Sequence, residues 1–218
     1  MSRLYLLAPD GMPVDPAFVA LAVARGVDRI VLQSSAAIEV MGDERLMAAE
    51  RTVRGSGARW TILRPDWFNQ NLDEGFFSHA VRAGELAVPV GDVRMAFVDA
   101  RDIAAVAAAA LTEAGHTGGS YDVTGPRALS FSEALEVIGK AVGHPVRFDG
   151  TVDGYLAAQE AIGRSRDEVA DEVAAFTALA EAGDAVPTDV VPRVTGRPAT
   201  TFEAYALEAA ARGAWRPD

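Results

Sequence analysis

Three short apolar runs, separated by longer helical patterns, constrain the fold of this chain most strongly. The runs cover residues 4–8, 29–33 and 59–63, and each is too short for a helix and apolar on consecutive positions, which is typical of strands buried on both faces. Between them, residues 16–25 and 43–56 have helical patterns that end near Gly26 and Gly57. Alternating strands and helices predict an α/β fold with a parallel sheet.

The second half of the sequence is expected to be mainly helical. Residues 73–82 have a helical pattern, and Asp102 is placed to be the N-cap of an alanine-rich helix that runs through Leu111. Residues 120–123 predict a short strand, and Ser130 begins a capping-box pattern for the next helix. We therefore place a sheet domain in residues 1–126 and a smaller, mainly helical subdomain in residues 127–218, interleaved rather than independent.

Composition excludes several classes of function. The chain has no cysteine, so a disulfide framework, a thiolate nucleophile and a cysteine-ligated metal site are excluded, and no other metal site is predicted. The net charge is −11, from 20 Lys and Arg against 31 Asp and Glu, which argues against a nucleic acid partner. No apolar run approaches the ~18 residues of a membrane span, and the first ten residues lack the apolar core of a signal peptide. We expect a cytoplasmic protein without a membrane partner.

Several motifs together resemble the NmrA-like branch of the atypical short-chain dehydrogenase/reductase family. They lie in residues 29–35, 50–57, 60–71, 97–104 and 121–126, in the family's order. The resemblance implies a Rossmann-like domain in residues 1–126 and a substrate subdomain in residues 127–218. It also implies an NAD(P) cofactor and a small-molecule substrate.

The resemblance does not include the segment that holds the cofactor diphosphate in this family. Family members begin with a strand, a Gly-x-x-Gly-x-x-Gly turn and a helix, followed by two more strand–helix units. Residues 4–8 match the family's fourth strand, and no such turn occurs in this sequence. We therefore expect a partial, N-terminally truncated doubly wound sheet, in which the chain alone binds NAD(P) weakly or not at all.

A truncated sheet of this kind leaves residues 4–8 at an apolar edge. The family's fourth strand pairs with its first, so here one row of backbone amides and carbonyls has no neighbour. We expect a homodimer that covers this edge, a partner chain that supplies strands, or a gene that begins further upstream.

The usual catalytic pair of the wider family is not found. The helix at 43–56 has no Tyr-x-x-x-Lys motif, and Leu46 stands where many NmrA-like proteins have a histidine before Glu50. The catalytic residue is therefore unassigned, with Ser34, Asp66 and Tyr155 as candidates. Each also has a purely structural interpretation: a strand end for Ser34, a loop carboxylate for Asp66 and a core aromatic for Tyr155.

Family position also suggests binding residues. For the cofactor these are Ala8, Pro9, Ser34, Pro65 and Phe68. For the substrate they are Trp67, Asn69, Asn71 and His79.

Three functional hypotheses remain open at this point. The first is an NAD(P)-linked oxidoreductase of the NmrA-like family, or a sensor of the dinucleotide. The second is a cofactor-independent isomerase or cyclase that uses the remaining cleft, with Asp66, Ser34 or Tyr155 as acid or base. The third is a non-catalytic regulatory or interaction module.

Overall fold

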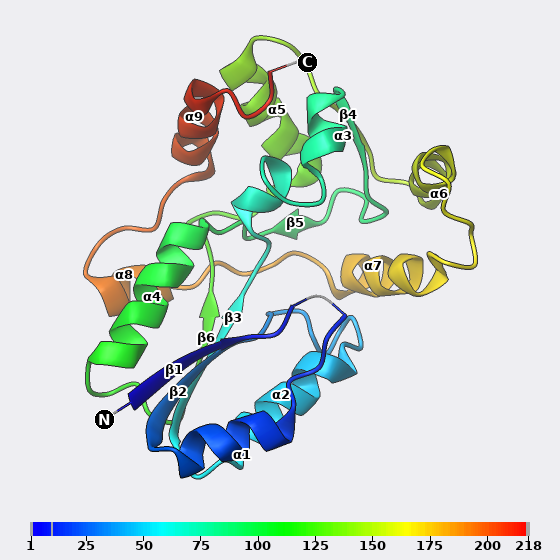
Figure 1. Cartoon of the computed structure of the whole chain (residues 1–218). Coiled ribbons are helices and arrows are strands. Elements are labelled where there is room, and N and C mark those ends of the chain that lie inside the picture. Colours follow the sequence, from blue (N-terminus) through cyan, green and yellow to red (C-terminus); the bar gives the residue numbers. More distant parts are fainter. Residues whose placement is uncertain (1, 10, 217–218) are drawn as a thin grey trace. The chain divides into compact units, whose positions relative to one another are not determined.

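The computed structural model describes residues 2–9 and 11–216 and divides the chain into two compact units (Figure 1). The first unit comprises Met1–Asp66, Arg101–Thr124 and Thr188–Ala199. The second comprises Trp67–Ala100, Gly125–Pro187 and Thr200–Asp218.

The first unit is a four-stranded parallel sheet with helices on both faces. The strand order is β1-β2-β3-β6, and every neighbouring pair is parallel. The predicted α/β fold with a parallel sheet is therefore confirmed. Its strands are β1 (Ser2–Leu7), β2 (Val27–Gln33), β3 (Arg59–Pro65) and β6 (Gly119–Val123), and its helices are α1 (Pro16–Ala24), α2 (Glu44–Arg54), α4 (Ala100–Thr112) and α8 (Val190–Thr195).

One face of this sheet is covered by α1 and α2. Val19 of α1 and Val53 of α2 join a buried cluster with Ile30, Leu32 and Ile62 of the central strands. Alternate residues of a strand point to opposite faces, so Arg29 lies on the other face. There its guanidinium donates to the backbone oxygen of Ala110, 2.9 Å away, near the C-terminal end of α4.

The first strand differs from expectation. It lies at the edge of the sheet, as predicted, but it is not buried on both faces: Tyr5 is 38% exposed and Leu7 55% exposed. The apolar pattern of residues 4–8 correctly indicated a strand. The prediction of burial was wrong because β2 is its only neighbouring strand among the described residues.

The second unit is mainly helical and contains two small two-stranded sheets. Strands β4 and β8 pair in parallel, and β5 and β7 pair antiparallel. Its elements are the 3₁₀ helix η1 (Asn69–Leu72), α3 (Ser78–Arg82), β4 (Glu85–Ala87), β5 (Arg94–Met95), β7 (Leu129–Ser130), α5 (Phe131–Val142), β8 (Arg147–Asp149), α6 (Val152–Ala161), α7 (Ala170–Ala182) and α9 (Phe202–Arg212).

Two predicted helix features in this part of the chain are wrong. The helix expected at 73–82 is only α3, because the backbone at Gly75 turns against Asn71: a Cβ on Gly75 would lie 2.8 Å from the Asn71 Cα. Asp102 is not an N-cap, because α4 begins at Ala100 and Asp102 lies inside its first turn. The capping box of Ser130 is confirmed.

The two units are interleaved along the sequence. Residues 67–100 belong to the second unit, and the chain returns to the first unit at Thr188. Two hydrogen bonds hold Thr188 in the first unit. The Thr188 N–H donates to Thr124 Oγ1 at 2.8 Å, and the Thr188 hydroxyl donates to the Asp122 backbone oxygen at 2.6 Å. Among the described residues, no helix is both long and apolar enough to cross a membrane.

Candidate functional site

The carboxyl ends of the first three strands bring together residues that the sequence singled out. Ala8 follows β1, Ser34 follows β2, and Pro65 is the last residue of β3. The parallel register holds these ends level, because the Ser34 N–H donates to the Leu63 backbone oxygen at 2.7 Å. Ala8, Ser34 and Pro65 are buried and Pro9 is exposed. Ligands of open α/β sheets bind at this edge, so these positions stay candidates for cofactor contacts.

Directly beside this edge lies a buried ion pair that the sequence analysis did not identify. Glu50 of α2 is 1% exposed, and its two carboxylate oxygens accept hydrogen bonds of 2.8 Å from Nε and Nη2 of Arg64. Burial alone would raise the pKa of Glu50, but the hydrogen bonds from Arg64 and the positive charges of Arg64 and Arg54 outweigh it and hold the pKa below its usual value. The sequence signal was Glu50 itself, a carboxylate on the apolar face of α2 next to Ala49.

The N-termini of α1 and α2, the helices that follow the first two strands in the sequence, do not fit a diphosphate. At α1 the N-cap is Asp15, whose carboxylate accepts from the Ala17 N–H at 2.8 Å. At α2 the N-cap is Asp43, whose carboxylate accepts from the Leu46 N–H at 3.0 Å. A phosphate group binds at a helix N-terminus whose backbone N–H groups are free and whose neighbouring side chains are uncharged or positive. At α1 and α2 a carboxylate already accepts from these N–H groups. The described residues thus offer no cradle for the cofactor diphosphate at these two helices.

The first unit holds the position aligned with the family's histidine and Asp66, one of the three catalytic candidates. Leu46 is buried on α2, so the position aligned with the family's histidine cannot transfer a proton. Asp66 is half-buried just beyond β3, and its backbone N–H donates to the Val123 oxygen at 3.1 Å.

In the second unit, Trp67 is part of an aromatic cluster. Its ring is stacked with those of Phe77 and Phe176, with centroids 5.8 and 6.1 Å away, and meets the ring of Phe131 edge-on at 5.3 Å. Phe77, Phe131 and Phe176 are buried, whereas Trp67 is half-buried. The cluster therefore holds a wide aromatic ring in a fixed orientation without covering it completely.

The other predicted substrate residues, and the predicted cofactor residue Phe68, lie in different environments. Asn69 is completely buried, and its side-chain amide has no hydrogen-bond partner among the residues the structure describes. Phe68 forms a β-bridge with Val98, Asn71 is half-buried, and His79 is exposed on α3. Contact of these residues with a ligand stays a prediction.

Tyr155, on α6, is engaged in a local network. It is 4% exposed, and its hydroxyl donates to Glu172 at 2.5 Å, while Arg164 also donates to Glu172. Burial, together with the Glu172 carboxylate, raises the pKa of Tyr155 far above its usual value. Its ring meets Phe176 edge-on at 5.7 Å, so Tyr155 adjoins the aromatic cluster.

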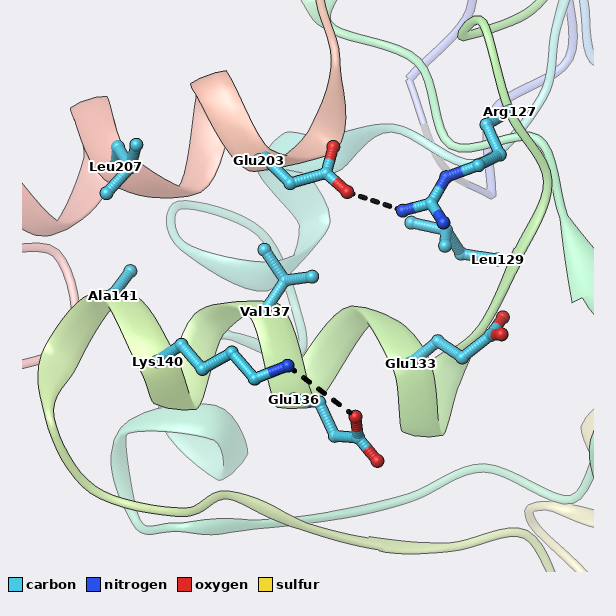
Figure 2. Close-up of a pocket in the computed structure, with 9 residues that line it drawn as sticks. All are labelled: Arg127, Leu129, Glu133, Glu136, Val137, Lys140, Ala141, Glu203 and Leu207. Atoms are coloured by element: carbon cyan, nitrogen blue, oxygen red, sulfur yellow. Dashed lines mark hydrogen bonds and ion pairs between the residues drawn. The ribbon is translucent and has the colours of Figure 1, made fainter.

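A groove of about 460 Å³ lies between α5 and α9 in the second unit (Figure 2). Figure 2 shows an ion pair at each side of it, Arg127 with Glu203 and Lys140 with Glu136. None of the residues that the sequence singled out lines this groove. In the described part of the chain, no three His, Asp or Glu side chains are grouped so that they could hold a metal ion.

Comparison with curated proteins shows the family. The NAD(P)H azoreductase of Xenophilus azovorans is 37% identical over a 218-residue alignment, which covers 95% of this chain and 74% of the azoreductase. The (4-alkanoyl-5-oxo-2,5-dihydrofuran-3-yl)methyl phosphate reductase of Streptomyces griseus is 36% identical, over 90% of this chain and 71% of that reductase. This chain belongs to the NAD(P)-binding, NmrA-like family of atypical short-chain reductases. No family model matches the sequence.

Two solved structures of proteins complexed with NADPH or NADP have the same fold. An NADPH-dependent quinone oxidoreductase from Escherichia coli, complexed with NADPH, is 23% identical with a TM-score of 0.79, over 95% of this chain and 76% of that one. NmrA, a negative transcriptional regulator in complex with NADP, is 16% identical with a TM-score of 0.64, over 97% and 75% of the two chains. At these identities the likeness concerns the fold alone.

Proposed function

We propose that this protein takes part in the NAD(P)H-dependent reduction of a small, flat, conjugated molecule. The observation that carries the proposal is the half-buried Trp67 ring, which Phe77, Phe131 and Phe176 hold in place. A fixed aromatic face favours a planar substrate, because stacking adds to the gain from burying apolar area. The proposal agrees with the azoreductase relative, whose name indicates reduction of an azo group, which is planar.

For the cofactor, NAD(P)H would supply the hydride. Ala8, Ser34 and Pro65 are the residues that we propose for the nicotinamide end, since they meet at the carboxyl edge of the sheet. The diphosphate needs partners other than the α1 and α2 N-termini, which Asp15 and Asp43 cap. The absence of the cofactor-binding portion from this chain stays a prediction, and the azoreductase alignment, which covers 95% of this chain, does not support it.

The proton-transfer candidates favour acceptors that need no positioned acid. Leu46 cannot donate a proton, and the Tyr155 hydroxyl is bound to Glu172 with a raised pKa. Quinone-like acceptors need no positioned acid, because their reduced anions take protons directly from water.

The test is to follow NADPH oxidation by the purified chain with a simple quinone and an azo dye as probes. We expect reduction whose rate keeps rising with NADPH into the millimolar range, because the diphosphate is poorly held. A folded protein that reduces neither probe at any NADPH concentration would overturn the proposal.

A fluorescence titration with NADPH separates the other two hypotheses. Tight binding without turnover would indicate a regulatory module. Redox-neutral turnover without any NADPH binding would indicate the cofactor-independent isomerase or cyclase.

A further inference from the structure

The four rings of the aromatic cluster in the second unit are not held equally firmly. Trp67, Phe77 and Phe131 each contact the other two, since Phe77 also meets Phe131 edge-on at 5.9 Å. Phe176 has ring contacts only with Trp67 and Tyr155 among the described residues. Removal of Phe176 would therefore leave the other three rings braced against one another, so it is the member that can leave the cluster most easily.

The helix that carries Phe176 is also lightly anchored. Helix α7 has 13 residues, of which Phe176 and Leu179 are buried. Helix α5, which carries Phe131, has five buried residues in 12, and a capping box fixes its start. Segments with few buried apolar side chains open at a lower cost in free energy than the core does. Phe176 can therefore shift with α7 while Phe131 stays in place.

Phe176 occupies a position that a flat ligand would also take. The rings of Phe77 and Phe176 are stacked on Trp67, with angles of 12° and 26° between the ring planes, whereas Phe131 meets it edge-on. A flat molecule that stacks on the indole therefore competes with one of these two rings for its faces. Phe77 is the firmer of the two, because Phe131 also braces it.

We propose that Phe176 is a specificity-determining residue, which covers part of the Trp67 ring until a flat conjugated substrate stacks there and displaces it. The inference rests on the proposed function and adds a criterion for the substrate. The substrate must gain more from stacking on the indole than Phe176 loses, and one aromatic pair is equivalent to about threefold to tenfold in affinity. Molecules with two fused flat rings meet this criterion better than a single ring, because they cover more of the indole.

The first experiment compares Phe176→Leu with the native protein in the NADPH-dependent reduction of 1,4-naphthoquinone, a flat molecule of two fused rings. Without the competing ring, the KM for this probe should fall about fivefold. The kcat should change little, because an interaction that is equally strong in the bound substrate and in the transition state alters only the KM. A KM that rises or stays the same overturns the inference, since Phe176 would then support the substrate or lie away from it.

Phe148→Leu is the matched control for this measurement. Phe148 is half-buried and stacks on Phe131, with centroids 5.7 Å apart, but it has no ring contact with Trp67 among the described residues. The substitution removes a ring from the same cluster, so it shows the effect of loosened packing alone, and the KM should stay near the native value. A fall in the KM as large as that of Phe176→Leu would count against the inference.

The second experiment tests whether Phe176 acts through Trp67. In a Trp67→Leu background, Phe176→Leu should no longer lower the KM, because no indole face remains to be uncovered. A fall of the same size in this background would refute the inference. Circular dichroism checks that each variant is folded. Phe176→Met, whose flexible side chain fills a similar volume, replaces Phe176→Leu if the latter does not fold, and it should also lower the KM.

These measurements separate the inference from the proposed function on which it rests. If the native protein reduces neither the naphthoquinone nor an azo dye at any NADPH concentration, the proposed function fails and the inference fails with it. If the native protein reduces the naphthoquinone but Phe176→Leu does not lower its KM, the inference alone fails.

Discussion

Arg64 and Glu50 join β3 to α2 through two parallel hydrogen bonds, each 2.8 Å long, at the carboxyl end of the sheet. Arg54 forms a further 2.8 Å ion pair with the same carboxylate from one turn along α2. The pair lies immediately before Pro65, so it fixes the place where β3 ends. This contact links the fold of the first unit to the positions of the candidate cofactor residues.

The first prediction concerns this ion pair. Glu50→Gln should lower the free energy of unfolding by about 3 kcal/mol, because the change removes the buried charged partner of the partly buried Arg64 guanidinium and leaves it only the exposed Glu39. Glu39→Gln is the matched control: Glu39 also contacts Arg64, at 3.2 Å, but its side chain is 70% exposed and should contribute less than about 1 kcal/mol. Urea denaturation measures both, and equal losses would contradict a special role for Glu50.

The same pair predicts a pH dependence. The pKa of Glu50 is lower in the folded protein than in the unfolded chain, where it is about 4.3. Its stabilisation is therefore present above pH ~4.3 and is lost as the pH falls through the folded pKa. The urea midpoint of the native protein should fall across this acidic range, and Glu50→Gln should remove that part of the fall. An unchanged pH profile in Glu50→Gln would show that other carboxylates account for it.

The sheet could be predicted from the sequence because its signals are local. Apolar runs of five residues indicate buried parallel strands, and a serine followed by a glutamate at the third position indicates a helix start. Both patterns depend only on neighbouring residues. The burial of β1 could not be predicted this way, because it depends on whether another strand or helix lies beside it.

The Arg64–Glu50 pair shows the same limit at the site. The two residues lie in different elements, and no spacing rule joins an arginine of a strand to a glutamate of the preceding helix. The late start of the helix predicted at 73–82 likewise depends on Gly75 approaching the Asn71 backbone, a contact made by the turn rather than by sequence periodicity.

The second prediction uses a backbone contact in the second unit. A Cβ on Gly125 would lie 1.9 Å from the Phe97 backbone oxygen, so Gly125→Ala must displace main chain and should cost about 3 kcal/mol. Gly55→Ala is the control, since its nearest neighbour would be 3.4 Å away and its φ of −84° suits alanine. Thermal unfolding should show a clear loss for Gly125→Ala and little change, or a small gain, for Gly55→Ala.

The third prediction tests whether Tyr155 is catalytic. Because its hydroxyl donates to Glu172, Tyr155→Phe should lower stability by about 1 kcal/mol and leave the rate of probe reduction nearly unchanged. Steady-state kinetics and denaturation of the same preparation separate the two effects. A folded Tyr155→Phe protein with a rate reduced a hundredfold would instead assign Tyr155 to proton transfer.

The fourth prediction concerns the aromatic face in the second unit. Trp67→Leu should raise the KM for a flat quinone or azo probe by about tenfold, because a leucine cannot stack on the probe as the indole ring does. The apparent affinity for NADPH should change little, since Trp67 is proposed to contact the substrate. Phe76→Leu is the control: Phe76 is 66% exposed and adjoins Phe77, with centroids 4.3 Å apart, but has no ring contact with Trp67. If both variants changed the KM equally, the effect would come from a general loosening of the cluster, and Trp67 would not be the face on which the substrate stacks.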